Sequence, residues 1–219
     1  MSVMGWLAGL RRVEAQSDGS PFDAFWQWFL SAEPRLRAAH GSGAMAELEA
    51  AVNEIGDRLN RVHPELCFEY GRADDGIFEL ILSAGGIRSL FSAVSALKQA
   101  APEVPGWRII AFRPRKASCA QVQLGEAVLE PEGLWYRLTP DADQADLDLF
   151  VADLTPETLE GLGGAAFLML DAALGEYDVA TRIGAIDFDA LPENPASLDL
   201  KPITALRADF DGLFPQTRQ

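Results

Sequence analysis

The chain is poor in the residues that build metal centres and nucleophilic triads. Its 219 residues include two cysteines and two histidines. Cys67 and Cys119 fit neither a metal-ligand spacing nor a disulfide framework, so we interpret them as buried or bystander thiols. His40 and His63 are too few and too widely separated for a histidine metal site or a triad. We therefore expect no metal, no cofactor and no machinery for nucleophilic catalysis.

Positive charge and long apolar runs are also scarce. The 18 Lys and Arg residues face 33 Asp and Glu, which gives a formal net charge of −15 at pH 7. This charge repels phosphate backbones and anionic membrane surfaces. No apolar run approaches the roughly 20 residues that a transmembrane helix needs. The first arginines follow the apolar stretch at the start of the chain, which is the reverse of a secretory signal. We expect a cytoplasmic protein that binds neither nucleic acid nor membranes.

The residues that are present indicate a mixed fold with a helical start. Hydrophobic residues make up 48% of the chain and charged residues 23%, which is typical of a globular protein. The first confident helix begins at Pro21 and should end near Glu33, because Pro34 disfavours helical geometry in the residue before it. A second helix carries one apolar stripe. We predict a helical hairpin over residues 20–62, preceded by a flexible segment at residues 1–19.

Two similar runs of strands and helices follow the hairpin. Residues 64–116 have the order strand, strand, helix, strand, and residues 126–192 repeat it. A helix that links two strands of one sheet is a crossover that covers one sheet face. We predict an α+β fold with a mixed sheet built from two ββαβ units, and we infer an internal duplication. A helix at residues 200–214 should close a single domain that spans residues 20–219.

The stretch FWQWF places four aromatic residues in five positions. Four aromatic side chains share one face of the predicted helix at steps of three and four: Phe22, Phe25, Trp26 and Phe29. This face should be buried in the core. Trp28 points elsewhere, so Trp28, together with Gln27, is the candidate for an exposed recognition residue.

A basic cluster is unusual in so acidic a chain. Arg113, Arg115 and Lys116, in FRPRK, follow a predicted strand. Guanidinium groups recognise carboxylates and phosphates through paired hydrogen bonds, so the cluster is a candidate anion site. Superimposing the closing strands of the two units instead sets Arg113 opposite Asp187 and Arg115 opposite Asp189. We favour internal pairing of this kind and keep an anion site and plain solvent exposure as alternatives.

An acidic cluster surrounds the end of the second crossover helix. Asp171, Glu176 and Asp178 lie in LDAALGEYD. Carboxylates at a helix C-terminus meet an unfavourable dipole, so their clustering requires compensation. Near Tyr177 they could hold a cation or supply a general base. The alternative, which we favour, is a solvated turn that pairs with a nearby arginine such as Arg182.

Three stretches together resemble a family of uncharacterised bacterial proteins: FWQWF, AAPEVPGWRIIAFRPR and LMLDAALGEYDVATRIGAIDF. The resemblance spans most of the chain, from Phe22 to Pro192, and its distinctive motifs are FWxWF, AFRPR and LDAALGEYD. No established reaction is attached to the family, so the resemblance implies no catalytic residues.

The missing catalytic constellation and the negative charge favour a non-enzymatic cytoplasmic protein. We expect it to bind another protein through an acidic or aromatic surface, as a regulator or an immunity-like inhibitor. The alternative is a small-molecule binding protein or enzyme that uses Arg113 and Arg115 against an anionic substrate, with Glu176 or Asp178 as base. Closed ion pairs at the arginines would argue against this alternative, and an open pocket with convergent arginines would favour it.

Overall fold

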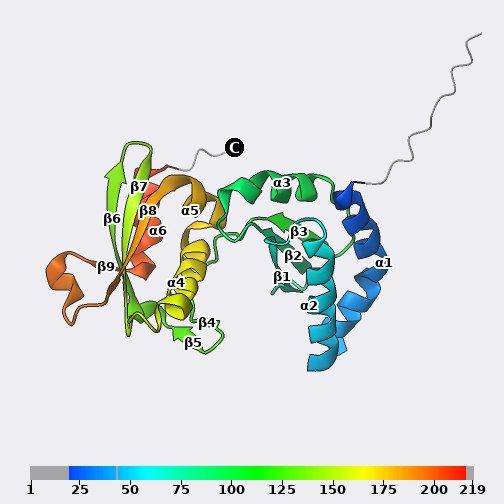
Figure 1. Cartoon of the computed structure of the whole chain (residues 1–219), viewed down its shortest axis with the longest axis horizontal. Helices are drawn as coiled ribbons and strands as arrows, with labels where there is room; N and C mark the ends of the chain where they lie inside the picture. Colours follow the sequence, from blue (N-terminus) through cyan, green and yellow to red (C-terminus); the bar gives the residue numbers. More distant parts are fainter. Residues whose placement is uncertain (1–19, 43, 216–219) are drawn as a thin grey trace, which may run out of the picture.

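The computed structural model describes residues 20–42 and 44–215. The flexible segment predicted at residues 1–19 lies outside this range. The chain has an α+β fold whose buried hydrophobic side chains form two separate cores. Each core belongs to one lobe, and the two lobes lie side by side along the longest axis of the molecule (Figure 1). Residues 112–116, called the connector below, run between them.

The amino-terminal lobe begins with the expected helical hairpin. Helices α1 (Pro21–Ser42) and α2 (Met45–Asn60) pack against each other at the outer edge of this lobe (Figure 1). The prediction that α1 ends near Glu33 is wrong, because the helix continues through Pro34. Leu36, beyond the proline, is fully buried. Its burial offsets the backbone hydrogen bond that proline cannot donate.

A three-stranded sheet completes the amino-terminal lobe. Its strands, in spatial order, are β1 (Cys67–Arg72), β2 (Phe78–Ser83) and β3 (Trp107–Ala111). Strands β1 and β2 are antiparallel, whereas β2 and β3 are parallel. The crossover from β2 to β3 contains a 3-10 turn, η1 (Arg88–Leu90), and helix α3 (Phe91–Gln99). This is the ββαβ order that the sequence predicts.

The carboxyl-terminal lobe contains a sheet with the same beginning. Strand β6 (Leu134–Asp141) is antiparallel to β7 (Gln144–Val151), which is parallel to β8 (Ile183–Ala190). The short strand β9 (Lys201–Pro202) lies on the other side of β6. The prediction of one mixed sheet built from both units is wrong, because each unit forms its own sheet. The shared strand order fits the inferred duplication, which stays a prediction.

Three helices pack on one face of this second sheet, and a hairpin packs on one of these helices (Figure 1). The crossover from β7 to β8 consists of α4 (Leu159–Leu174) and α5 (Glu176–Arg182), and α6 (Leu206–Leu213) follows the sheet. The hairpin of β4 (Val122–Leu124) and β5 (Ala127–Leu129) contacts α4. Three further 3-10 turns complete the described chain: η2 (Pro131–Gly133), η3 (Pro195–Leu198) and η4 (Ile203–Ala205). No helix within the described residues is long and apolar enough to span a membrane.

The aromatic stretch of α1 lies in the core of the amino-terminal lobe. As predicted, Phe25, Trp26 and Phe29 are buried and Phe22 is partly buried. The prediction that Trp28 is exposed is wrong, because α2 covers that side of α1 and leaves the residue 9% exposed. Its Nε1 donates to Glu54 Oε1 at 2.9 Å, and the Arg58 guanidinium lies 5.4 Å from its ring centroid. Only Gln27 of the proposed recognition pair is exposed.

Replacing Trp28 with alanine should therefore destabilise the protein. The change removes a buried indole and leaves a cavity between α1 and α2, so we expect a loss of about 3 kcal/mol in the free energy of unfolding. Gln27→Ala, on the exposed side of the same helix, is the matched control and should change it by less than about 0.5 kcal/mol. Urea denaturation followed by far-UV circular dichroism measures both. Equal midpoints for Trp28→Ala and the unchanged protein would contradict the burial of Trp28.

Candidate functional site

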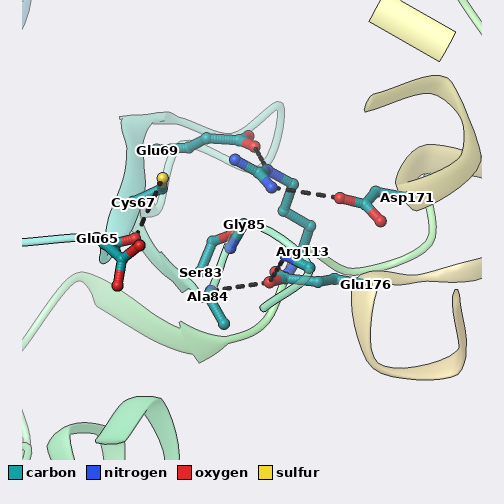
Figure 2. A network of polar contacts seen from close by, with 10 residues as sticks. Glu65, Cys67, Glu69, Ser83, Ala84, Gly85, Arg113, Asp171 and Glu176 are labelled. Carbon is teal, nitrogen blue, oxygen red and sulfur yellow. Dashed lines mark hydrogen bonds and ion pairs between the residues drawn. The ribbon is translucent and has the colours of Figure 1, made fainter. Parts of the chain in front are cut away.

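The basic and acidic clusters predicted from the sequence meet where the lobes join. Arg113 lies on the connector, and its Nε donates to Glu69 Oε1 of β1 at 2.7 Å. Its Nη1 donates to Asp171 Oδ2 of α4 at 3.2 Å (Figure 2). Arg113 is therefore paired internally, as favoured from the sequence. The prediction that Arg113 pairs with Asp187 is wrong. Its guanidinium instead binds Glu69 of the amino-terminal lobe and Asp171 of the carboxyl-terminal lobe.

Arg115 ties the connector to three helices of the carboxyl-terminal lobe. Its Nε donates to the Leu174 carbonyl at the end of α4 at 2.5 Å. Nη2 and Nη1 donate to Asp178 of α5 and Asp211 of α6 at 2.9 and 2.7 Å. The predicted pairing with Asp189 is therefore wrong. Each aspartate thus binds one of the two terminal nitrogens of the guanidinium.

We call the contacts between the two lobes and the connector the junction. Glu176 is its central residue. Its side chain is fully buried, although a carboxylate loses much solvation when it leaves water. Oε1 accepts hydrogen bonds from the backbone N–H groups of Ala84 at 2.8 Å and Gly86 at 3.3 Å, in the turn that follows β2. Oε2 accepts one from the backbone N–H of Arg113 at 2.9 Å (Figure 2). A carboxylate of the carboxyl-terminal lobe thus binds the main chain of the other lobe and of the connector.

Phe112, in the connector, contacts residues of both lobes. Phe112 adopts a φ of 65°, which costs a non-glycine residue about 1 kcal/mol or more. Its N–H donates to the Leu82 carbonyl at 2.7 Å, and its ring centroid lies 4.5 Å from that of Phe91 and 5.5 Å from that of Tyr177. These contacts offset the strain, and they join α3 to α5.

Lys116 takes part in the junction through its backbone. Its N–H donates to the Ala172 carbonyl of α4 at 2.8 Å, and its carbonyl accepts from the Arg207 guanidinium. The side chain is exposed. Lys116 therefore does not join the two arginines in one anion pocket.

The predicted acidic cluster is compensated by the connector. The arginine that pairs with it was expected to be Arg182, but Arg182 Nη1 donates to the Asp143 carbonyl instead. Arg113 and Arg115 supply the compensation. Burial raises the pKa of Asp171 to about 6, the Arg113 charge opposes this shift, and the Glu176 charge adds to it. Within the part of the chain that the structure describes, no group of three His, Cys, Asp or Glu side chains could hold a metal ion.

One cavity adjoins the junction, and a second lies within the carboxyl-terminal lobe. One, of about 720 Å³, is lined from the amino-terminal lobe by the stretch around Gly86 and Arg88 and from the other lobe by α4, α5 and β8. We call it the inter-lobe cleft. The other, of about 670 Å³, lies between the β4–β5 hairpin and the start of α4. It is called the acidic groove below. The sequence gives no direct signal for the inter-lobe cleft, because it forms between segments far apart in the chain.

Comparisons of the chain with protein-family models, with curated proteins and with solved structures give no match. The resemblance to an uncharacterised bacterial family stays a prediction. The motifs that carry it, AFRPR and LDAALGEYD, contain the residues that meet in the junction, since they supply Arg113 and Arg115 on one side and Asp171, Glu176 and Asp178 on the other.

Replacing Glu176 should loosen the junction. Glu176→Ala leaves three backbone N–H groups without their acceptor, and each buried donor left unsatisfied costs about 1–3 kcal/mol. Since the extensive packing between helices and strands lies within each lobe, we expect the thermal unfolding of this variant to split into two calorimetric transitions. Glu176→Gln should destabilise less, because its amide keeps one acceptor oxygen.

Glu103→Gln, at an exposed position between α3 and β3, is the control for the lost charge and should unfold like the unchanged protein. A single transition at the unchanged temperature in Glu176→Ala would contradict a central role for Glu176. The same experiment tests the single domain expected over residues 20–219, because one cooperative transition in the unchanged protein would support it.

Replacing Asp171 with asparagine should alter the pH dependence of stability. The Asp171 pKa is about 6 in the folded protein against 3.8 for the ordinary side chain. The stability that this group contributes is therefore fully present below about pH 4 and is lost as the pH rises through about 6. Because one pKa unit corresponds to about 1.4 kcal/mol, the unchanged protein should lose up to about 3 kcal/mol relative to Asp171→Asn between pH 4 and pH 7.

The measurement is urea denaturation of both proteins at each pH, and the quantity compared is the difference between them. This difference cancels the titration of other carboxyl groups, while Arg113, Glu69 and Glu176 stay beside the substituted position. A difference that is constant with pH would show that Asp171 titrates at its ordinary pKa.

Proposed function

We propose that this protein is a non-enzymatic binding module that docks a basic segment of a partner protein, as a regulator or an immunity-like inhibitor would. The observation that carries the proposal is the acidic groove. Four exposed carboxylates line it: Glu126, Glu130, Asp153 and Glu157. No Lys, Arg or His side chain is among its lining residues.

Apolar side chains between these carboxylates supply a surface on which a partner could bury area. Leu129 and Leu162 are buried in the core beneath the groove. Leu124 and Val128, on the hairpin, are 42% and 47% exposed. Burial of such side chains contributes about 25 cal/mol per Å². The pattern therefore matches a segment with both apolar and basic residues, since the carboxylates select its charge and the leucines and valine supply the contact area.

The net charge of the whole chain supports the same class of partner. At −15, the protein attracts a basic partner over long distances and raises the rate of encounter at low salt. The ion pairs of the junction use Arg113 and Arg115 and leave the carboxylates of the groove exposed. Binding should accordingly weaken as the salt concentration rises.

The closed junction argues against the alternative of an enzyme or an anion-binding protein built on the arginine pair. Arg113 and Arg115 each bind two carboxylates of the chain itself. Glu176, proposed as a base, is fully buried and accepts three backbone hydrogen bonds. An anionic substrate would have to break these contacts before it could reach the arginines.

Charge reversal in the groove tests the proposal. The double variant Glu126→Lys with Glu157→Lys should weaken binding of a fluorescent amphipathic lysine-rich peptide at least tenfold, since two favourable charge contacts become repulsive. The matched control, Asp187→Lys with Asp189→Lys on β8, changes the net charge equally at exposed positions outside the groove and should weaken binding no more than about threefold. Fluorescence anisotropy at two salt concentrations measures both.

The native partner is tested with the same variants. The unchanged protein and the β8 variant should retain one stoichiometric partner from a cell extract, and the groove variant should lose it. Equal losses in the two double variants would show that only net charge matters, and the absence of any stoichiometric partner with the unchanged protein would contradict the proposed function.

A further inference from the structure

The inter-lobe cleft has apolar walls that remain open to solvent. Phe167 of α4 is 43% exposed and Ile87, before η1, is 38% exposed, although both are large hydrophobic residues. Leu168 and Ile186 line the same cavity from α4 and β8. Exposed apolar side chains that gather around one cavity indicate a surface that a ligand covers. The volume of about 720 Å³ falls within the range of roughly 300–1,000 Å³ found for small-molecule sites.

Three charged residues line the cleft. They are Arg88, Arg113 and Asp171, and Arg113 also pairs with Glu69 of β1 at 2.7 Å. Arg113 and Asp171 pair with each other at 3.2 Å. Arg88 is therefore the lining charge that lacks a counter-charge in the cleft.

Arg88 also has hydrogen-bonding capacity to spare. Its Nη2 donates to the Ile183 carbonyl at 3.2 Å. The side chain therefore reaches from the amino-terminal lobe to the point where α5 ends and β8 begins. Within residues 20–42 and 44–215, the Arg88 side chain forms no other hydrogen bond and no ion pair. A guanidinium has five N–H donors, so most of those on Arg88 are available. Two adjacent donors can bind the two oxygens of one carboxylate.

We propose that the inter-lobe cleft binds a small carboxylic acid with an apolar body. The carboxylate pairs with Arg88, and the apolar body lies against Phe167, Leu168 and Ile186. A bare inorganic anion does not fit these walls, because it would lose water without gaining apolar contact. An amine does not fit either, because Asp171 is already paired with Arg113. The cleft shares the lining residue Leu124 with the acidic groove, but the proposal does not depend on the proposed function.

Three probes with the same apolar body separate the contribution of the charge from that of the walls. Octanoate, octanol and octylamine are titrated into the full chain by isothermal calorimetry at pH 7. Octanoate should bind with one site per chain and at least tenfold more tightly than octanol, because a hydrogen bond to a charged group contributes a factor of about ten or more. Octylamine should bind more weakly than octanol. Failure of octanoate to bind, or tighter binding of octylamine, would overturn the proposal.

Substitutions in the cleft locate the binding. Arg88→Gln should reduce octanoate affinity at least tenfold, to the level of octanol, and leave octanol binding unchanged. Arg88→Lys should restore part of the preference for octanoate. Phe167→Ala, at an exposed position, should weaken octanoate and octanol to the same extent. Arg61→Gln, an exposed arginine at the end of α2, is the control and should bind octanoate like the unchanged protein.

Circular dichroism of each variant verifies the fold. Unchanged octanoate affinity in a folded Arg88→Gln variant would overturn the role of Arg88. If Arg88→Gln does not fold, the decision falls to Arg88→Lys and Phe167→Ala, and undiminished octanoate affinity in Phe167→Ala would exclude the cleft as the site. None of the substituted residues lines the acidic groove, so failure here leaves peptide docking unaffected, and loss of peptide docking leaves octanoate binding unaffected.

Discussion

The arrangement of the two lobes depends on one buried carboxylate. Glu176 belongs to the carboxyl-terminal lobe, but its oxygens accept hydrogen bonds from Ala84 and Gly86 of the other lobe and from Arg113 on the connector. A carboxylate with no exposure is stable only when it is fully hydrogen-bonded. The requirement works in both directions: the turn after β2 needs an acceptor for its N–H groups, and Glu176 needs those donors. Each lobe therefore completes a polar site of the other.

This interaction explains why residues that resemble a catalytic cluster serve the structure instead. Three carboxylates and two arginines in two short motifs suggest chemistry when they are read along the chain. In space, the arginines neutralise Asp171 in the last turn of α4, where the helix dipole disfavours a carboxylate, and Asp178 in the first turn of α5, where the dipole favours one. Arg113 joins the two lobes, and Arg115 fixes the connector to the carboxyl-terminal lobe.

Local pattern predicted the elements well and their tertiary partners poorly. The strand order of both units and the buried face of α1 follow from periodicity, because burial repeats with the period of the element. Trp28 was assigned to the surface since the sequence does not reveal the side on which α2 packs. The alignment of the two units placed Arg115 opposite Asp189, but its partner Asp211 lies on α6, outside both units. Glu176 binds main-chain N–H groups, which have no signature in the sequence except the paired glycines at 85 and 86, both with positive φ.

The junction also determines the inter-lobe cleft, and one side chain of the cleft also lines the acidic groove. Leu124 of β4 lines the inter-lobe cleft and the acidic groove. The opposite wall of the cleft comes from the amino-terminal lobe. The width of the cleft therefore depends on the contacts of Glu176 and Arg113. A molecule in the cleft that touches Arg88 and α4 contacts both lobes, and it stabilises the arrangement in which these walls face each other.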